Sequence, residues 1–226
     1  QDLHHLFGLA CFAEYAVVHE RSAVKIREDA PLDVVCLLGC GTSAGIGAVL
    51  NTAGVKAGES IVIYGCGGVG LSAVMAAKLA GAGMIIAVDM LDTKLEMAKE
   101  LGAHYVINAS QENPQQKALE LTGTGVHYAV PCVGNADAIM QAYGSLRMGG
   151  KCVVVGLPPI GVNLNIAPYE LLLGKTITGE GRPTLCVENL PIQIMGTLPG
   201  GGIRLHKGDQ DLHHLFGLAC FAEYAV

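Results

Sequence analysis

The sequence predicts an α/β fold built on a doubly wound parallel sheet, and three observations support this prediction. From Gly58 onward, short runs rich in β-branched residues alternate with segments of helical apolar spacing. The runs are almost wholly apolar, as strands covered on both faces of a parallel sheet are. The glycine-rich turn GCGGVG (65–70) joins the first run to the first helical segment. Helices on both faces of one sheet are therefore expected.

Strands are expected over residues 61–65, 84–89, 104–108, 126–130, 151–156 and 175–180. Helices are expected over residues 70–79, 93–101, 114–121 and 136–146. For the second helix, a capping box of Thr93 and Glu96 is expected to begin it, and Gly102 is expected to end it.

Composition limits the classes of function. The chain has 226 residues, 51% of them apolar, which is enough for one main domain with a sizeable core plus fragments. The net charge is −6 without a basic run, so no nucleic-acid partner is expected. The eight cysteines form no C-x-x-C pair and follow no signal peptide, which favours a reducing, cytoplasmic location. Residues 61–88 are apolar enough to suggest a membrane span, but their glycines indicate a buried βαβ unit and no membrane partner.

The turn GCGGVG carries the strongest chemical signal, because it follows a strand and opens a helix. In such a turn Gly65 allows the tight bend, Gly67 lets a pyrophosphate approach the backbone, and Gly70 lets helix and strand pack closely. The anion would then lie at the helix N-terminus, where the free N–H groups of residues such as Gly68 favour it. We expect a dinucleotide to bind here.

Asp89 ends the next strand. A carboxylate at this place accepts the hydroxyl groups of an adenosine ribose and repels a 2′-phosphate, which favours NAD over NADP. A charge that only stabilises the following helix is the alternative. Lys94, in the first turn of that helix, either reaches the same ribose or is a solvated lysine.

Metal binding is not predicted by spacing alone. Cys36 and Cys40 stand four residues apart, without a third cysteine or a histidine nearby in the sequence, so buried apolar thiols are the better interpretation. His4 and His5 are adjacent, and adjacent side chains rarely bind one ion.

One peptide occurs at both ends of the chain, since residues 210–226 repeat residues 1–17 without a difference. Repeat architectures need at least three copies and usually diverge. The identity therefore indicates either a very recent copying event or a sequence whose two ends overlap.

Several of these stretches resemble one family, the zinc-containing alcohol dehydrogenases of the medium-chain dehydrogenase/reductase superfamily. The resemblance rests on HHLFGLACFAEYAVVHERSAVKI (4–26), on the long run from LLGCG through GCGGVG to IIAVD (37–89), and on VVVGLPP (153–159). It implies hydride transfer between an alcohol or aldehyde and NAD, with zinc as a second cofactor and a homodimer as a possible state. Two alternatives stay open: a non-catalytic NAD-binding module, such as a redox sensor, and a methyltransferase.

The order of segments departs from the family. A segment like GRPTLC to HKGD (181–209) precedes HHLFG in the family and follows the last strand here. The chain thus resembles a partial, circularly rearranged fragment, either an artefact of gene reconstruction or a permuted duplication. The resemblance implies a remnant of a β-rich, GroES-like catalytic domain at 1–30, a Rossmann domain at 31–180, and a displaced catalytic-domain segment at 181–226 that ends in a copy of 1–17.

The resemblance also implies roles for single residues. Cys40 matches one ligand of a catalytic zinc and Cys186 one ligand of a structural zinc, but the family's other ligands have no counterpart here. We therefore expect this chain to bind no zinc and to oxidise no alcohol. Leu6 and Phe7 match positions of the substrate pocket. Positions along the nicotinamide and its ribose are matched by Val69, Val133, Gly134, Val155 and Gly156, with Ala44 and Pro131 as departures from the family's usual threonine and acidic residue.

Overall fold

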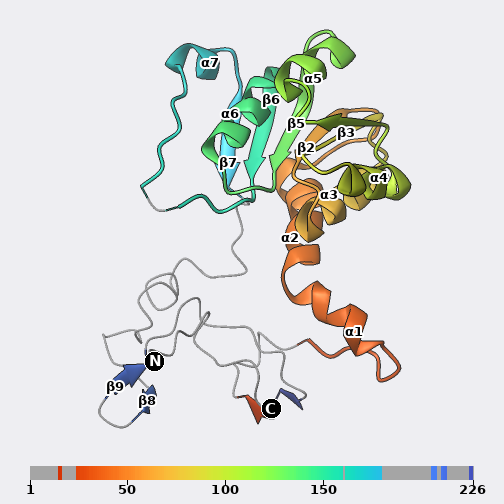
Figure 1. Cartoon of the computed structure of the whole chain (residues 1–226), viewed down its shortest axis with the longest axis vertical. Coiled ribbons are helices and arrows are strands. Elements are labelled where there is room, and N and C mark those ends of the chain that lie inside the picture. The colour runs from red at the N-terminus through yellow and green to blue at the C-terminus, as the bar shows by residue number, and fades with distance from the viewer. Residues whose placement is uncertain are drawn as a thin grey trace. The chain divides into compact units, whose positions relative to one another are not determined.

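The chain divides into two compact units, one of residues 40–181 and one that joins residues 1–39 to 182–226. The structure is a computed structural model (Figure 1). It describes residues 15–16, 24–159, 161–179, 205–207, 210–212 and 224–225. Each unit is considered by itself.

The larger unit contains a parallel sheet with the strand order β4-β3-β2-β5-β6-β7 (Figure 1). The chain builds outward from β2 through β3 and β4, then returns to the other side of β2 to add β5, β6 and β7. This order places a topological switch point between β2 and β5, and it confirms the predicted doubly wound fold. The strands are β2 (Ser60–Tyr64), β3 (Met84–Asp89), β4 (Tyr105–Asn108), β5 (Val126–Pro131), β6 (Leu146–Val154) and β7 (Thr176–Gly179).

Helices cover both faces of the sheet because successive strand side chains point to opposite faces. Ile61 and Ile63 of β2 belong to one apolar cluster, together with residues of η3, α3 and α4. Val62 and Tyr64 belong to a second cluster, with residues of α5 and α6. The helices are α2 (Gly41–Gly47), η3 (Ala48–Ala53), α3 (Gly68–Leu79), α4 (Asp92–Leu101), α5 (Pro114–Thr122), α6 (Ala136–Gly144) and α7 (Pro168–Leu172).

Several details differ from the sequence prediction. The strand expected over 151–156 is β6, which runs from Leu146 to Val154. The helix expected over 136–146 ends at Gly144, and Leu146 already pairs with Val126 in the sheet before an irregularity shifts the register. The capping box predicted for α4 is wrong. Leu91 occupies the N-cap without a side-chain hydrogen bond, so Thr93 lies inside the helix. Gly102 does end α4, with a φ of 125° that favours glycine.

The smaller unit contains short elements in its described residues. These are α1 (Leu32–Val35), η2 (Cys36–Gly39), a parallel pair of β1 (Tyr15–Ala16) with β10 (Tyr224–Ala225), and an antiparallel pair of β8 (Leu205–Lys207) with β9 (Gln210–Leu212). Tyr15 pairs with Tyr224, its own duplicate.

Membrane-spanning length is not reached by any single helix among the described residues. Within the described part of the chain, one bent pair of successive helical segments, Leu32–Gly39 and Gly41–Ala53, meets the criteria of length and composition when taken together.

Candidate functional site

The turn between β2 and α3 requires glycine at two places. Gly65 has a φ of 92°, and a Cβ there would overlap Cγ1 of Val133. A Cβ on Gly70 would overlap the carbonyl oxygen of Gly65, so only glycine lets α3 begin this close to the end of β2. These two glycines are buried and shape the turn.

The other two glycines of the turn face open space. Gly67 and Gly68 are exposed, and a Cβ on either would meet no atom within 4 Å. Gly67 is the N-cap of α3 and supplies no side-chain hydrogen bond. The first N–H groups of a helix have no carbonyl partner within the helix, and the helix dipole makes this end positive. This end of α3 can therefore accept an anion such as a pyrophosphate.

Asp89, at the end of β3, is fixed beside this turn. Its Oδ2 atom accepts a hydrogen bond of 2.7 Å from the backbone N–H of Cys66, inside the turn. Its Oδ1 atom accepts hydrogen bonds from the N–H groups of Met90 at 2.8 Å and Leu91 at 3.1 Å. Two carboxylate oxygens offer about four lone-pair positions, so the half-buried carboxylate keeps room for a further donor such as a ribose hydroxyl.

The pKa of the Cys66 thiol is changed by burial and by nearby charges. Burial raises its pKa to about 12, with a further upward contribution from the Asp89 carboxylate and an opposing one from the Lys94 ammonium group. The thiol thus stays protonated at neutral pH and is no nucleophile. The Asp89 carboxylate and the Lys94 ammonium group thus have opposite effects on the pKa of the Cys66 thiol.

The ends of β5 and β6 lie across the switch point from the turn. The Pro131 carbonyl oxygen accepts hydrogen bonds of 3.0 Å from the N–H groups of both Val155 and Gly156. A Cβ on Gly156 would overlap the backbone of Val133, and one on Gly134 would overlap the Leu157 carbonyl oxygen. Since Val133 also contacts Gly65, these segments and the turn form one continuous edge of the sheet. Contact with a nicotinamide stays a prediction for the four residues Val133, Gly134, Val155 and Gly156.

Cys36 and Cys40 are both exposed, so their interpretation as buried apolar thiols is wrong. Cys40 forms the N-cap of α2. The next residue, Gly41, faces Val69, since a Cβ there would lie 3.6 Å from Val69 Cγ2. The structure thus places Cys40 close to the glycine turn. Among residues 24–159 and 161–179 no three or more His, Cys, Asp or Glu side chains gather in a way that could hold a metal ion. A single thiolate does not fit a catalytic zinc site, which needs three protein ligands.

Other predicted residues cannot be placed. Leu6, Phe7 and Cys186 lie outside the described residues, as do His4 and His5. Cys36 lies in η2 of the smaller unit.

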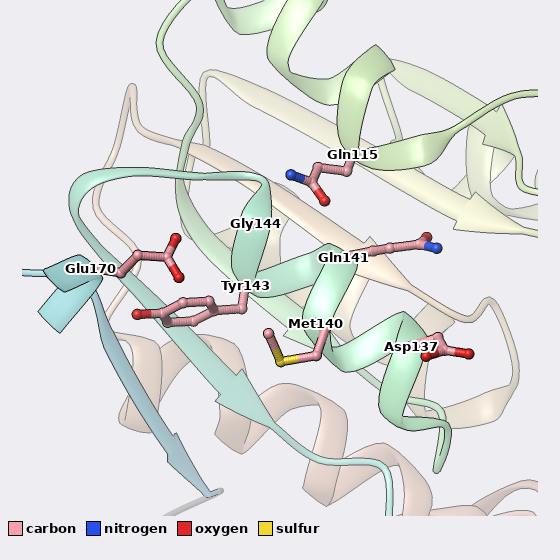
Figure 2. Close-up of a pocket in the computed structure, with 7 residues that line it drawn as sticks. All are labelled: Gln115, Asp137, Met140, Gln141, Tyr143, Gly144 and Glu170. Atoms are coloured by element: carbon pink, nitrogen blue, oxygen red, sulfur yellow. The ribbon is translucent and has the colours of Figure 1, made fainter. Parts of the chain in front are cut away.

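A depression of about 440 Å³ lies over α5, α6 and α7 (Figure 2). Glu170 of α7 forms an ion pair of 3.0 Å with Lys175, whose ammonium nitrogen lies 5.3 Å from the centre of the Tyr143 ring. The lining contains none of the residues predicted to bind a cofactor: it consists of Gln115, Asp137, Met140, Gln141, Tyr143, Gly144 and Glu170.

Comparison with known proteins supports the fold described above. The profile of a family described as zinc-binding dehydrogenase matches residues 68–188, more than half of the sequence. The chain belongs to this family. S-(hydroxymethyl)glutathione dehydrogenases from Synechocystis sp. and from Photobacterium damsela subsp. piscicida are each 41% identical over 182 residues. That match covers 79% of this chain and 49% of each relative, so the chain spans about half the length of these curated relatives.

Solved structures support the same relationship. An alcohol dehydrogenase zinc-binding domain protein from Burkholderia ambifaria is 42% identical, with a TM-score of 0.68 over 71% of this chain and 44% of that one. Benzyl alcohol dehydrogenase from Acinetobacter calcoaceticus is also 42% identical, with a TM-score of 0.65 over 69% and 43%. An alcohol dehydrogenase from Thermus sp. ATN1 is 29% identical, with a TM-score of 0.63 over 69% and 45%.

Proposed function

We propose that the larger unit is the NAD-binding part of an oxidoreductase that transfers a hydride between an alcohol or aldehyde and NAD. One observation carries the proposal. The Asp89 carboxylate is held by the N–H of Cys66 beside a helix N-terminus that has no side-chain cap and faces open space at Gly67 and Gly68. An acceptor for a ribose next to a site for a pyrophosphate matches the two polar parts of an adenine dinucleotide.

Each residue has a defined task in this proposal. The N–H groups at the start of α3 bind the pyrophosphate, and Asp89 accepts the ribose hydroxyls while its charge opposes a 2′-phosphate. Lys94 reaches the same ribose. NAD, when bound, supplies the hydride acceptor. Along the nicotinamide half, the side chains of Val69, Val133 and Val155 exclude water, and the backbones of Gly134 and Gly156 allow close approach.

Zinc belongs to the complete protein in this proposal, with Cys40 as one of its ligands. The described residues assemble no zinc site. Because the family's other zinc ligands have no counterpart in the sequence, we expect this chain alone to oxidise no alcohol. The names of its relatives, benzyl alcohol dehydrogenase and S-(hydroxymethyl)glutathione dehydrogenase, support an alcohol or aldehyde as the substrate class. The domain boundaries at residues 30 and 180, a homodimer and a cytoplasmic location belong to the same proposal.

Calorimetric titration of the chain with NADH, NADPH and S-adenosylmethionine tests the proposal. We expect NADH to bind and the other two to bind weakly or not at all. The variant Asp89→Asn should bind NADH about tenfold more weakly and lose its preference against NADPH, because it lacks the charge that opposes the 2′-phosphate. Equal affinity of the unchanged chain for NADH and NADPH would contradict the role of Asp89. Binding of S-adenosylmethionine in place of NADH would indicate a methyltransferase.

A further inference from the structure

Helix α2 meets the first turns of α3 through a glycine. Gly45 is buried, and a Cβ at this position would overlap the carbonyl oxygen of Val69. The same Cβ would lie 2.9 Å from Ser72 Cβ and 3.0 Å from the backbone nitrogen of Ala73. Two of these three atoms belong to the backbone of α3, which cannot move aside as the end of a flexible side chain can. The two helix backbones are therefore as close at Gly45 as a residue without a side chain permits.

Gly41 provides a contrast on the same face of α2. Positions four residues apart on a helix lie one above the other, so Gly41 and Gly45 both face α3. A Cβ on Gly41 would lie 3.6 Å from Val69 Cγ2, which is an ordinary van der Waals contact. A methyl group thus fits at Gly41 and does not fit at Gly45, although both positions face Val69.

This contact joins the two functional parts of the site. Cys40 is the N-cap of α2, and α3 begins at Gly68 with the N–H groups that face the proposed pyrophosphate. We propose that Gly45 is a positioning residue of the nucleotide site, which sets the spacing between Cys40 and the glycine turn by allowing α2 to rest on the backbone of α3. This inference rests on the proposed function, because it assigns Gly45 to the NAD site described above.

If Gly45 had a role in packing alone, its substitution would have a different effect. If Gly45 only allowed the core to close, the variant Gly45→Ala would unfold more easily, but its folded form would bind NADH as the unchanged chain does. If Gly45 sets the spacing, the folded variant would bind NADH more weakly. The bound cofactor would also no longer shield the Cys40 thiol.

The test combines NADH titration with alkylation of cysteines by iodoacetamide. Alkylation is followed by mass spectrometry with and without NADH, at equal occupancy by NADH in each variant, and the exposed Cys36 serves as the reference thiol within the same chain. We expect NADH to slow the alkylation of Cys40 in the unchanged chain and in Gly41→Ala. Overpacking of a tight contact is expected to weaken NADH binding by Gly45→Ala at least tenfold and to remove the protection of Cys40.

The outcomes are distinct. Binding within twofold of the unchanged chain, with protection of Cys40 retained in Gly45→Ala, would overturn the positioning role while leaving the proposed function intact. Absence of NADH binding by the unchanged chain would instead overturn the proposed function, and the inference with it. If Gly45→Ala does not accumulate as folded protein, Ser72→Thr adds a methyl group from the α3 side of the contact and keeps the hydroxyl that donates to the Gly68 carbonyl oxygen, with Gly41→Ala again as the control.

Discussion

The two edges of the central sheet differ in how their polar groups are used. At the amino ends of the strands, side chains bind one another: Ser60 Oγ lies 2.8 Å from His127 Nδ1, and the Tyr128 hydroxyl donates to Glu59 Oε2 at 2.6 Å. Lys151 donates to the carbonyl oxygens of Thr52 and Ala53 at the end of η3. At the carboxyl ends, glycines leave backbone N–H groups facing open space.

Polar groups at the amino edge stabilise the fold, whereas polar groups at the carboxyl edge stay free to bind a ligand. At the amino edge, hydrogen bonds join β2 to β5 and leave few polar atoms for a ligand. At the carboxyl edge, Asn113 of α5 and Asn135 of α6 cap their helices with a side chain, whereas the N-cap of α3 is a glycine, and α2, α4 and α7 also begin without a side-chain cap. Compared with Ser, Thr, Asn or Asp, a glycine N-cap costs a few tenths of a kcal/mol of stability. In the proposed function, a bound dinucleotide would offset this cost.

The largest expected effect is that of Gly70→Ala. The added Cβ would overlap the Gly65 carbonyl oxygen in a buried turn, so strand or helix must shift. We expect the free energy of unfolding to fall by about 3 kcal/mol or more, as measured by urea denaturation. A decrease below about 1 kcal/mol would show that the turn relaxes more readily than the geometry indicates.

At the amino edge, Tyr128→Phe removes the hydroxyl group that donates to Glu59. This hydrogen bond holds the pKa of the Glu59 carboxyl below its ordinary value. Burial, with a smaller contribution from the same hydrogen bond, raises the pKa of Tyr128 to about 12. We expect a loss of about 1 to 2 kcal/mol in the free energy of unfolding. NADH affinity should be unchanged, because the substitution lies at the opposite edge from the nucleotide site. Weaker NADH binding by this variant would contradict the proposal that the amino edge takes no part in nucleotide binding.

Gly67→Ala should weaken NADH binding more than it lowers the stability of the fold. Its φ of −77° suits alanine and the added Cβ meets no protein atom within 4 Å, so only the poorer capping by alanine should lower the free energy of unfolding, by about 0.5 to 1 kcal/mol. The methyl group occupies the space in which the pyrophosphate would approach the backbone, and NADH affinity should fall about tenfold. Calorimetry and urea denaturation of the same preparation check both expectations. Retained affinity would place the pyrophosphate elsewhere.

The smallest effect concerns pH and His127. Burial, with a smaller contribution from Arg147, lowers the pKa of His127 below its ordinary value of 6.5, while Glu59 opposes this shift. His127 Nδ1 accepts a hydrogen bond from the Ser60 N–H, which requires the neutral ring. The stabilisation is therefore present above pH 6.5 and is lost as the pH falls through the lower folded-state pKa.

Urea midpoints between about pH 8 and about pH 5 test this expectation. The decline in stability over that range should be smaller in His127→Gln than in the unchanged chain. An equal decline in both would assign the pH dependence to other groups.

Sequence reasoning was most successful where the signal is local. The apolar run at 84–89 predicts β3 with its observed bounds, because a buried parallel strand is continuous in sequence. The start of β6 was missed, since Leu146 pairs with Val126 and the register then shifts, which no local pattern shows.

The candidate site divides in the same way. The glycine turn and Asp89 follow from a known spacing, although their roles stay predictions. The amino-edge contacts join residues 67 and 69 positions apart and depend on the order of the strands. Gly45 was not identified from the sequence, because its importance comes from the approach of α3.

Hydrogen–deuterium exchange with and without saturating NADH tests the central claim most directly, because it reports on both edges of the sheet in one sample. We predict slower exchange for the backbone N–H groups from Gly67 to Gly70 when NADH is bound. Exchange at Ser60 and His127, at the amino edge, should be unchanged. Protection that appears at the amino edge, or that is absent from the glycine turn while NADH binds, would contradict the assignment of the carboxyl edge as the nucleotide site.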